Sequence, residues 1–190
     1  MANKDAAFGL KPIGKIGQNA DNNGLSEYDI AASATAIYFQ DPVEILATGT
    51  IGVAAAGDTT ILGSLNGVFF TDANTSKPTF ANHLDASNAA TDIKGFVTDD
   101  PYQRYEVQSD NTSASAQTDI GNVANIEYTA GSAPNFVSKV ELDDSDLATT
   151  DGQLKVIGVS KDPENNDLTS ANVNFVVTIN EHFLKQEAGI

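Results

Sequence analysis

Apolar and polar residues alternate along most of the chain from Leu25 onward. A period of two is typical of a β-strand that buries one face and exposes the other. The clearest stripe runs from Val173 to Ile179, where every second residue is apolar and most of the residues between them are asparagine or threonine. The same alternation predicts short strands within residues 28–30, 37–39, 43–46, 48–53, 67–71, 104–108, 136–142 and 154–158.

The segments between these strands are rich in Gly, Asn, Asp, Ser and Thr, which are residues that favour turns. Clusters of them lie at residues 21–24, 73–76 and 162–167. Helical patterns are weak, and we expect at most a short helical turn within residues 81–90 and another within residues 181–187. Many short strands separated by turns predict an all-β fold with little helix, formed by a single antiparallel β-barrel or β-sandwich domain.

The opening stretch differs from the rest of the chain in charge and in pattern. Residues 1–18 contain three lysines and one aspartate, so their formal charge is 3 − 1 = +2. Glycine and proline in this stretch oppose a helix, while the apolar residues between them argue against a fully solvated linker. We therefore predict an extended N-terminal arm over residues 1–24, which docks on another surface, and a β-rich body over residues 25–190; a frayed terminus is the alternative. The candidate contact residues of the arm are Lys4, Phe8, Leu10, Lys11, Ile13, Lys15 and Ile16.

The chain as a whole is strongly acidic, with 26 Asp and Glu against 10 Lys and Arg in 190 residues and a net charge of −16. Nucleic-acid binding needs clustered cations, so this balance argues against it. The absence of cysteine excludes disulfides and thiolate chemistry. No apolar run approaches the roughly 20 residues that span a bilayer, and Met1 is not followed by the apolar stretch of a signal peptide. We expect a protein that is synthesised in a cytoplasm and binds neither nucleic acid nor membrane.

Motifs that would indicate an enzyme or a cofactor are weak or missing. Residues 9–15 have the spacing of a phosphate-binding loop, but Ile16 stands where that loop needs a hydroxyl for magnesium. His83 and His182 lie far apart in the sequence, and we interpret them as an exposed loop histidine and a chain-end histidine. No Gly-x-Ser-x-Gly motif marks a hydrolase nucleophile. We therefore expect no enzymatic activity and no cofactor.

Acidic clusters at residues 99–100, 143–146 and 162–167 offer oxygen atoms of the kind that bind calcium. None of them has the ligand spacing or the closing glutamate of a helix–loop–helix calcium site. Asp and Asn also form turns and helix caps, so the commoner interpretation of these clusters is a solvated acidic surface. Whether one of them binds calcium stays open at this point.

Several short segments resemble a family of small structural proteins from tailed bacteriophages, many of them marine. The resemblance begins with DAAFGLKP at residues 5–12 and continues with GVFFTD at residues 67–72. An acidic-proline turn, VTDDP at residues 97–101, then leads into an aromatic strand that ends in glutamine, YEVQSD at residues 105–110. Residues 140–143, 154–159 and 179–182 continue the likeness in the same order along the chain. The chain departs from the family at residues 81–84, where an aromatic pair is often found.

This resemblance implies a capsid decoration or cement protein of a virion. Such proteins are small β domains, often trimeric, that clamp the outer surface of a shell made by the major capsid protein. The implied partners are therefore the major capsid protein and further copies of this chain in a homotrimer, and the arm residues become a hypothetical capsid-binding site. Two other classes stay open: a protein associated with the tail or the head–tail connector, and a carbohydrate-binding β-sandwich, which the absence of tryptophan makes less favoured.

Overall fold

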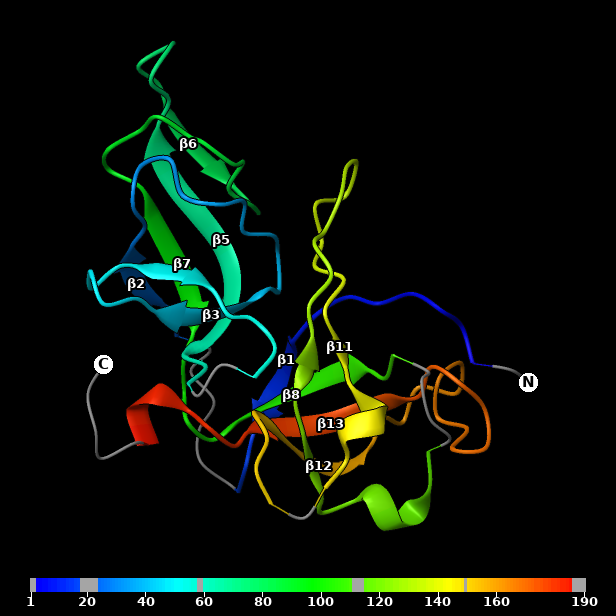
Figure 1. Ribbon diagram of the computed structural model, residues 1–190. Coiled ribbons are helices and arrows are strands. Elements are labelled where there is room, and N and C mark those ends of the chain that lie inside the picture. Colours follow the sequence, from blue (N-terminus) through cyan, green and yellow to red (C-terminus); the bar gives the residue numbers. More distant parts are fainter. Residues whose placement is uncertain (1–2, 18–23, 58–59, 111–114, 149, 186–190) are drawn as a thin grey trace.

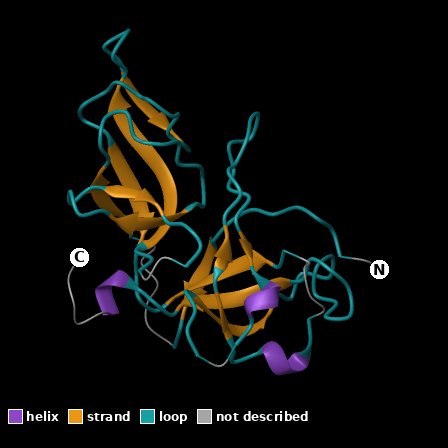
Figure 2. Cartoon of the chain, viewed as in Figure 1, coloured by secondary structure: helices purple, strands orange, loops and turns teal. Residues whose placement is uncertain are grey.

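The computed structural model describes residues 3–17, 24–57, 60–110, 115–148 and 150–185, and it confirms the all-β class. Antiparallel sheets pack together as in a β-sandwich and do not close into a barrel, so the sandwich is the correct one of the two expected architectures. The helices of the described part are three short 3₁₀ turns: η1 (Gln117–Asp119), η2 (Asp144–Asp146) and η3 (Phe183–Lys185). Figure 2 shows how strands and long loops make up almost all of the chain.

The first sheet has five strands in the order β1-β8-β13-β12-β9, and its neighbouring strands run antiparallel (Figure 1). Three of its strands were expected from the alternation of apolar residues, and the first strand belongs to the stretch that we predicted as an arm. The strands are β1 (Lys11–Lys15), β8 (Gln103–Gln108), β9 (Val123–Ala124), β12 (Leu154–Val159) and β13 (Asn174–Ile179).

The second sheet has the order β2-β7-β5-β3-β4, and β6 pairs with the far end of β5. Its strands are β2 (Ser26–Asp29), β3 (Pro42–Ile45), β4 (Ile51–Val53), β5 (Gly63–Thr71), β6 (Pro78–Ala81) and β7 (Lys94–Thr98). A separate two-stranded sheet pairs β10 (Ile126–Glu127) with β11 (Glu141–Leu142).

Two hydrophobic cores lie against the two main sheets. In the first core, the apolar stripe predicted from Val173 to Ile179 is confirmed, because every second residue is at most 1% exposed. The expected solvent exposure of the opposite face is wrong, since Asn174 and Thr178 are only 5% and 7% exposed. The second core is formed mainly by aliphatic side chains of β3, β4, β5 and β7 and of the loops beside them. The largest completely buried side chains are Tyr105, Phe175, Leu10, Ile37, Ile51, Ile61, Leu62, Leu65, Leu84, Ile93, Ile126 and Leu142.

Two of the links between the sheets are made by backbone hydrogen bonds from core residues. Leu10 donates its N–H to the Gln40 carbonyl at 2.9 Å and accepts a hydrogen bond from Ser64 Oγ at 2.7 Å, although its side chain belongs to the first core. The Ile61 N–H donates to the Glu181 carbonyl at 2.9 Å, which ties the end of β13 to the chain that enters β5. These bonds satisfy backbone groups that burial would otherwise leave without partners.

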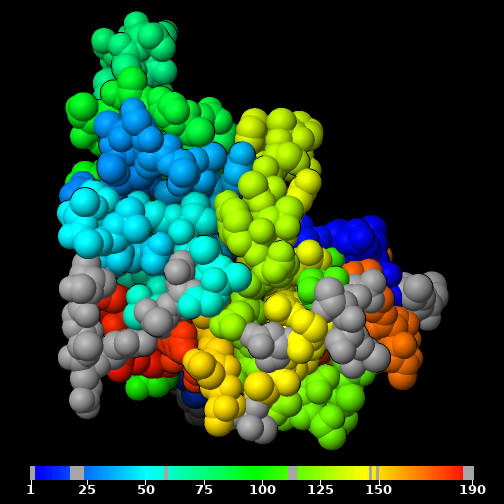
Figure 3. All heavy atoms as spheres, in the orientation of Figure 1, coloured from blue at the N-terminus to red at the C-terminus, as the bar shows by residue number. Residues whose placement is uncertain are grey.

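A third link is the long loop between β10 and β11, which lies against the second sheet in Figure 3. Phe39 and Val137 form an isolated bridge, and the His83 ring stacks on Phe136 with centroids 3.8 Å apart and planes 1° apart. A strand was expected over residues 136–142, but only its last two residues form one. Phe136 has a positive φ of 54°, which breaks the extended path and turns its ring toward His83.

The expected helical turn within residues 81–90 is wrong, because this segment contains the end of β6, bends and turns, and no helix. The expected turn near residue 183 is confirmed as η3, and residues 186–187 of that prediction lie outside the described ranges.

Candidate functional site: the N-terminal segment and its groove

Residues 3–16, called the N-terminal segment below, carry all seven predicted contact residues. The segment is extended, as expected, and it lies along the body of the same chain before it enters the first sheet as β1 (Figure 1). The boundary between an arm and a body at residue 24 stays a prediction, and residues 1–2 and 18–23 lie outside the described residues.

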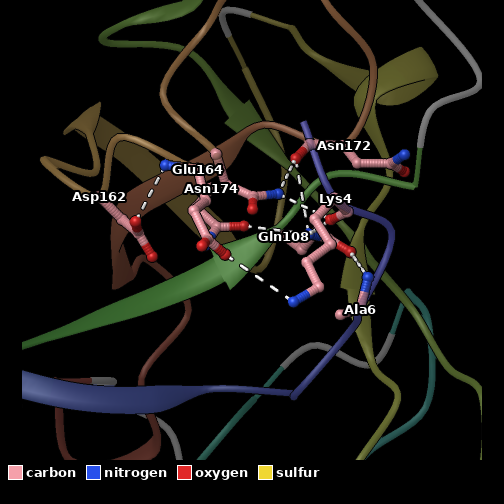
Figure 4. Close-up of polar contacts among 8 residues, drawn as sticks. Lys4, Ala6, Gln108, Asp162, Glu164, Asn172 and Asn174 are labelled. Carbon is pink, nitrogen blue, oxygen red and sulfur yellow. Dashed lines mark hydrogen bonds and ion pairs between the residues drawn. The ribbon is translucent and has the colours of Figure 1, made fainter. Parts of the chain in front are cut away.

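A polar cluster fixes the beginning of this segment (Figure 4). Gln108 is 1% exposed; its Nε2 donates to the Lys4 carbonyl at 2.9 Å and its Oε1 accepts from the Ala6 N–H at 2.8 Å. Asn165 Nδ2 also donates to the Lys4 carbonyl, at 2.8 Å. Gln108 in turn donates to Asn174 Oδ1 at 3.1 Å, so strands β8 and β13 both contribute to the cluster. The buried amides therefore recognise the backbone of the segment, whatever its side chains are.

The next residues thread between the two sheets. Gly9 has a φ of +77°, and a Cβ built there would overlap the Gln40 carbonyl oxygen and the side chain of Ser138. Only glycine fits this close approach without strain. Leu10 follows with its side chain completely buried in the first core. The Leu10 side chain therefore packs in the core of its own chain and is not available to a partner.

The cations of the segment have acidic partners within the chain. Lys11 Nζ lies 3.1 Å from Glu106 Oε2 and 5.7 Å from the centre of the Phe8 ring. Ser160 Oγ donates to the other oxygen of Glu106, which is 7% exposed. Glu106 therefore has a partner for each of its two carboxylate oxygens. The positive charge of Lys11 is therefore matched inside the molecule.

Lys15 makes the corresponding contact at the other end of β1. Its Nζ lies 2.8 Å from Asp100 Oδ2, and this hydrogen bond lowers the pKa of the Asp100 carboxyl. Asp100 belongs to the acidic-proline turn between β7 and β8, so the pair joins β1 to the crossing between the two sheets. Lys4 lies 3.8 Å from Glu164 with both side chains well exposed, a geometry that contributes at most about 1 kcal/mol.

A groove of about 550 Å³ separates β1 from the second sheet. Ile13 and Leu25 line it and are each 43% exposed, and Ile16 at the end of the segment is exposed to the same degree. The remaining lining residues are Lys11, Pro12, Gly14, Lys15, Gly24, Gln40, Asn66, Thr98, Asp100 and Gln103. Of the predicted contact residues, Ile13 and Ile16 are thus the apolar ones that face outward, and their role in capsid binding stays a prediction.

The two histidines differ from what the sequence suggested. His83 is not an open loop residue: its side chain is only 14% exposed, between Phe136 and Tyr38, and its Nε2 lies 3.3 Å from Asp85 Oδ1. His182 is 1% exposed, and burial lowers its pKa to about 4. Burial penalises the charged imidazolium, so His182 is neutral near pH 7. The two rings belong to separate parts of the structure.

The acidic clusters of the sequence were considered above as possible calcium sites. Among the described residues, no group of three or more His, Asp or Glu side chains is arranged to hold a metal ion. Glu141 lies near several other carboxyls: burial, and then the charges of Asp5, Asp110, Glu127 and Asp144, raise its pKa to about 7. Crowded carboxyls of this kind favour the protonated form of one member.

Sequence reasoning missed Asp41, a completely buried carboxyl between the second sheet and the β10–β11 loop. Its Oδ2 accepts a hydrogen bond from the Tyr38 N–H at 2.7 Å. Burial nevertheless raises the pKa of Asp41 to about 6 from 3.8. An Asp before proline is a common turn residue, so the sequence carried no signal that this one is enclosed.

Asp41 is expected to make stability depend on pH. Because its pKa is higher in the folded protein than in the unfolded chain, the folded state binds the proton more tightly between about pH 4 and pH 6. The contribution of Asp41 to the free energy of unfolding should therefore fall as the pH rises through that window. In Asp41→Asn this contribution is expected to vanish, since the amide has no charge to bury. Urea unfolding of both proteins at pH 4, 5, 6 and 7 measures the difference, and parallel curves would contradict the assignment.

Comparisons with known proteins add no relative: no family model, no curated protein and no solved structure matches this chain. None of the helices in the described ranges is long and apolar enough to cross a membrane.

Proposed function

We propose that this chain is a non-enzymatic structural protein of a virion, which decorates the capsid and stabilises the head. In this proposal its partner is the major capsid protein, whose outer surface it binds, and it acts as a homotrimer, as members of the phage family that it resembles often do. The segments that carry this resemblance include residues 5–12, which the structure uses to connect the sheets.

The observation that supports the proposal most is the bracing of the two sheets. The N-terminal segment is fixed by Gln108 at its start, by Leu10 in the middle and by Lys15 at its end, and these contacts involve strands of the first sheet and loops and strands of the second. A protein that reinforces a shell must transmit load through its own body. The contacts that link the two sheets are consistent with that task.

The net charge of the chain also fits a location on the outer surface of a capsid. A net charge of −16 makes the protein a poor neighbour for packaged DNA, because like charges repel, and suits the outer side of a shell. Many copies bound to one lattice would also convert modest individual contacts into strong reinforcement.

Binding to empty shells tests the proposal. Purified protein is titrated onto capsids that were assembled without it, and the bound amount is measured after sedimentation. We expect saturation at a fixed ratio to the shell subunits, together with a higher melting temperature of the decorated shell. The matched control is the major capsid protein before assembly, which offers no completed lattice. Failure to sediment with capsids at any concentration would contradict the proposal.

A further inference from the structure

The outer face of the second sheet carries three aromatic side chains, Phe69, Phe80 and Phe96, called the phenylalanine face below. The rings of Phe69 and Phe80 have centroids 4.8 Å apart, and those of Phe80 and Phe96 are 6.4 Å apart and nearly parallel, at 15°. Phe80 is 75% exposed, more than any other large apolar side chain of the described residues. Phe69 and Phe96 are half-buried beside it. A contiguous apolar patch on the surface is a feature of sites that bind a partner.

The register of the strands places all three rings on the same side of the sheet. Phe69 of β5 stands directly opposite Phe80 of β6, and Phe96 of β7 is paired with Gly67 of β5, two residues before Phe69. The neighbouring positions Val68 and Val97 are at most 1% exposed and belong to the second core. Because side chains alternate along a strand, the phenylalanines must point away from that core.

Charged side chains flank the phenylalanine face. Lys94, which is paired with Phe69 across the strands, lies 2.7 Å from Asp29 and 3.4 Å from Glu27. Asp92 beyond it accepts a hydrogen bond from Thr71 Oγ1 at 2.7 Å. The flank thus holds three carboxylates and one cation. Added to the charge of the whole chain, it fits a partner with an apolar centre and surrounding Lys or Arg, and it repels nucleic acid and anionic lipid.

We propose that the phenylalanine face is the surface that docks on the capsid shell, against an apolar patch of the major capsid protein flanked by basic residues. This inference rests on the proposed function and relocates its contact surface. The N-terminal segment is less suited to that role, since Leu10 is buried and Lys11 and Lys15 are already paired within the chain. Aromatic side chains at the centre of an interface commonly contribute most of its binding energy.

The test compares two exposed side chains on different surfaces. Phe80→Ala removes the most exposed ring of the phenylalanine face, and Ile13→Ala removes an exposed side chain of the β1 groove. Both proteins should melt like the wild type, because neither residue belongs to a core. We expect Phe80→Ala to bind undecorated capsids at least about tenfold more weakly and Ile13→Ala to bind like the wild type.

The outcomes separate the inference from the proposed function. If the wild type and Phe80→Ala bind undecorated capsids equally well, the phenylalanine face is not the docking surface. Capsid decoration itself would then remain supported. Loss of binding in Ile13→Ala alone would overturn it as well and would assign the contact to the groove. Absence of wild-type binding would overturn the proposed function and the docking role with it. Weaker binding by Phe80→Ala alone supports the inference.

Discussion

Replacing Phe175 with alanine should destabilise the protein by about 3–5 kcal/mol, the usual cost of removing a buried phenylalanine. The ring is completely buried in the first core, on the central strand β13, between β8 and β12. The loss combines the transfer of apolar surface with a cavity that the surrounding strands cannot fill. Urea unfolding followed by circular dichroism measures it directly.

Ile157→Ala is the matched control for this experiment. Ile157 lies on the neighbouring strand β12 but is 36% exposed, so its replacement should change stability by less than about 1 kcal/mol. If Phe175→Ala unfolds at the same urea concentration as the wild type, the stripe on β13 is not a core and the first sheet is oriented differently.

Replacing Gly9 with alanine should cost about 2–5 kcal/mol, from two separate causes. The positive φ of Gly9 alone costs an L-residue about 1–2 kcal/mol, and overlap in a closely packed site adds about 1–3 kcal/mol. The overlap is with the Gln40 carbonyl and Ser138, both of which are parts of the body that cannot move aside easily. The substitution should therefore loosen the contact of the N-terminal segment with the second sheet.

Gly49→Ala separates the two causes. Gly49 has nearly the same φ, +79°, but nothing lies within 4 Å of a Cβ built there. It should lose only the backbone part, about 1–2 kcal/mol. Equal melting temperatures for the two variants would mean that residue 9 is not enclosed, and that the segment lies on the body less closely than the structure describes.

The strands that could be predicted are those whose inward positions are all large and apolar. β13 meets this condition, with Phe175 and Val177 both buried. β7 does not, because one of its inward residues is Gly95, where an added Cβ would lie 2.8 Å from Ile51 Cδ1 and 3.0 Å from Ile30 Cδ1. The side chains of neighbouring elements fill this position, so the sequence of β7 alone shows too little alternation to indicate a strand.

The candidate site could be predicted less completely than the fold. Glycine, proline and apolar residues correctly indicated an extended segment over the first residues, but not the surface on which it lies. That surface depends on Gln108 and Asn165, whose buried amides bind backbone atoms and leave no pattern in the sequence. The phenylalanine face was missed for a similar reason: Phe69 and Phe80 become neighbours only through the pairing of β5 with β6.

The most direct test of capsid decoration is the number of copies of this chain relative to the major capsid protein in purified virions, measured by quantitative mass spectrometry. We expect a ratio near one to one, or a fixed large fraction of it, because a decoration protein repeats over the whole lattice. A handful of copies per particle would move the protein to the tail or the connector, and its complete absence from virions would contradict a structural role in the particle.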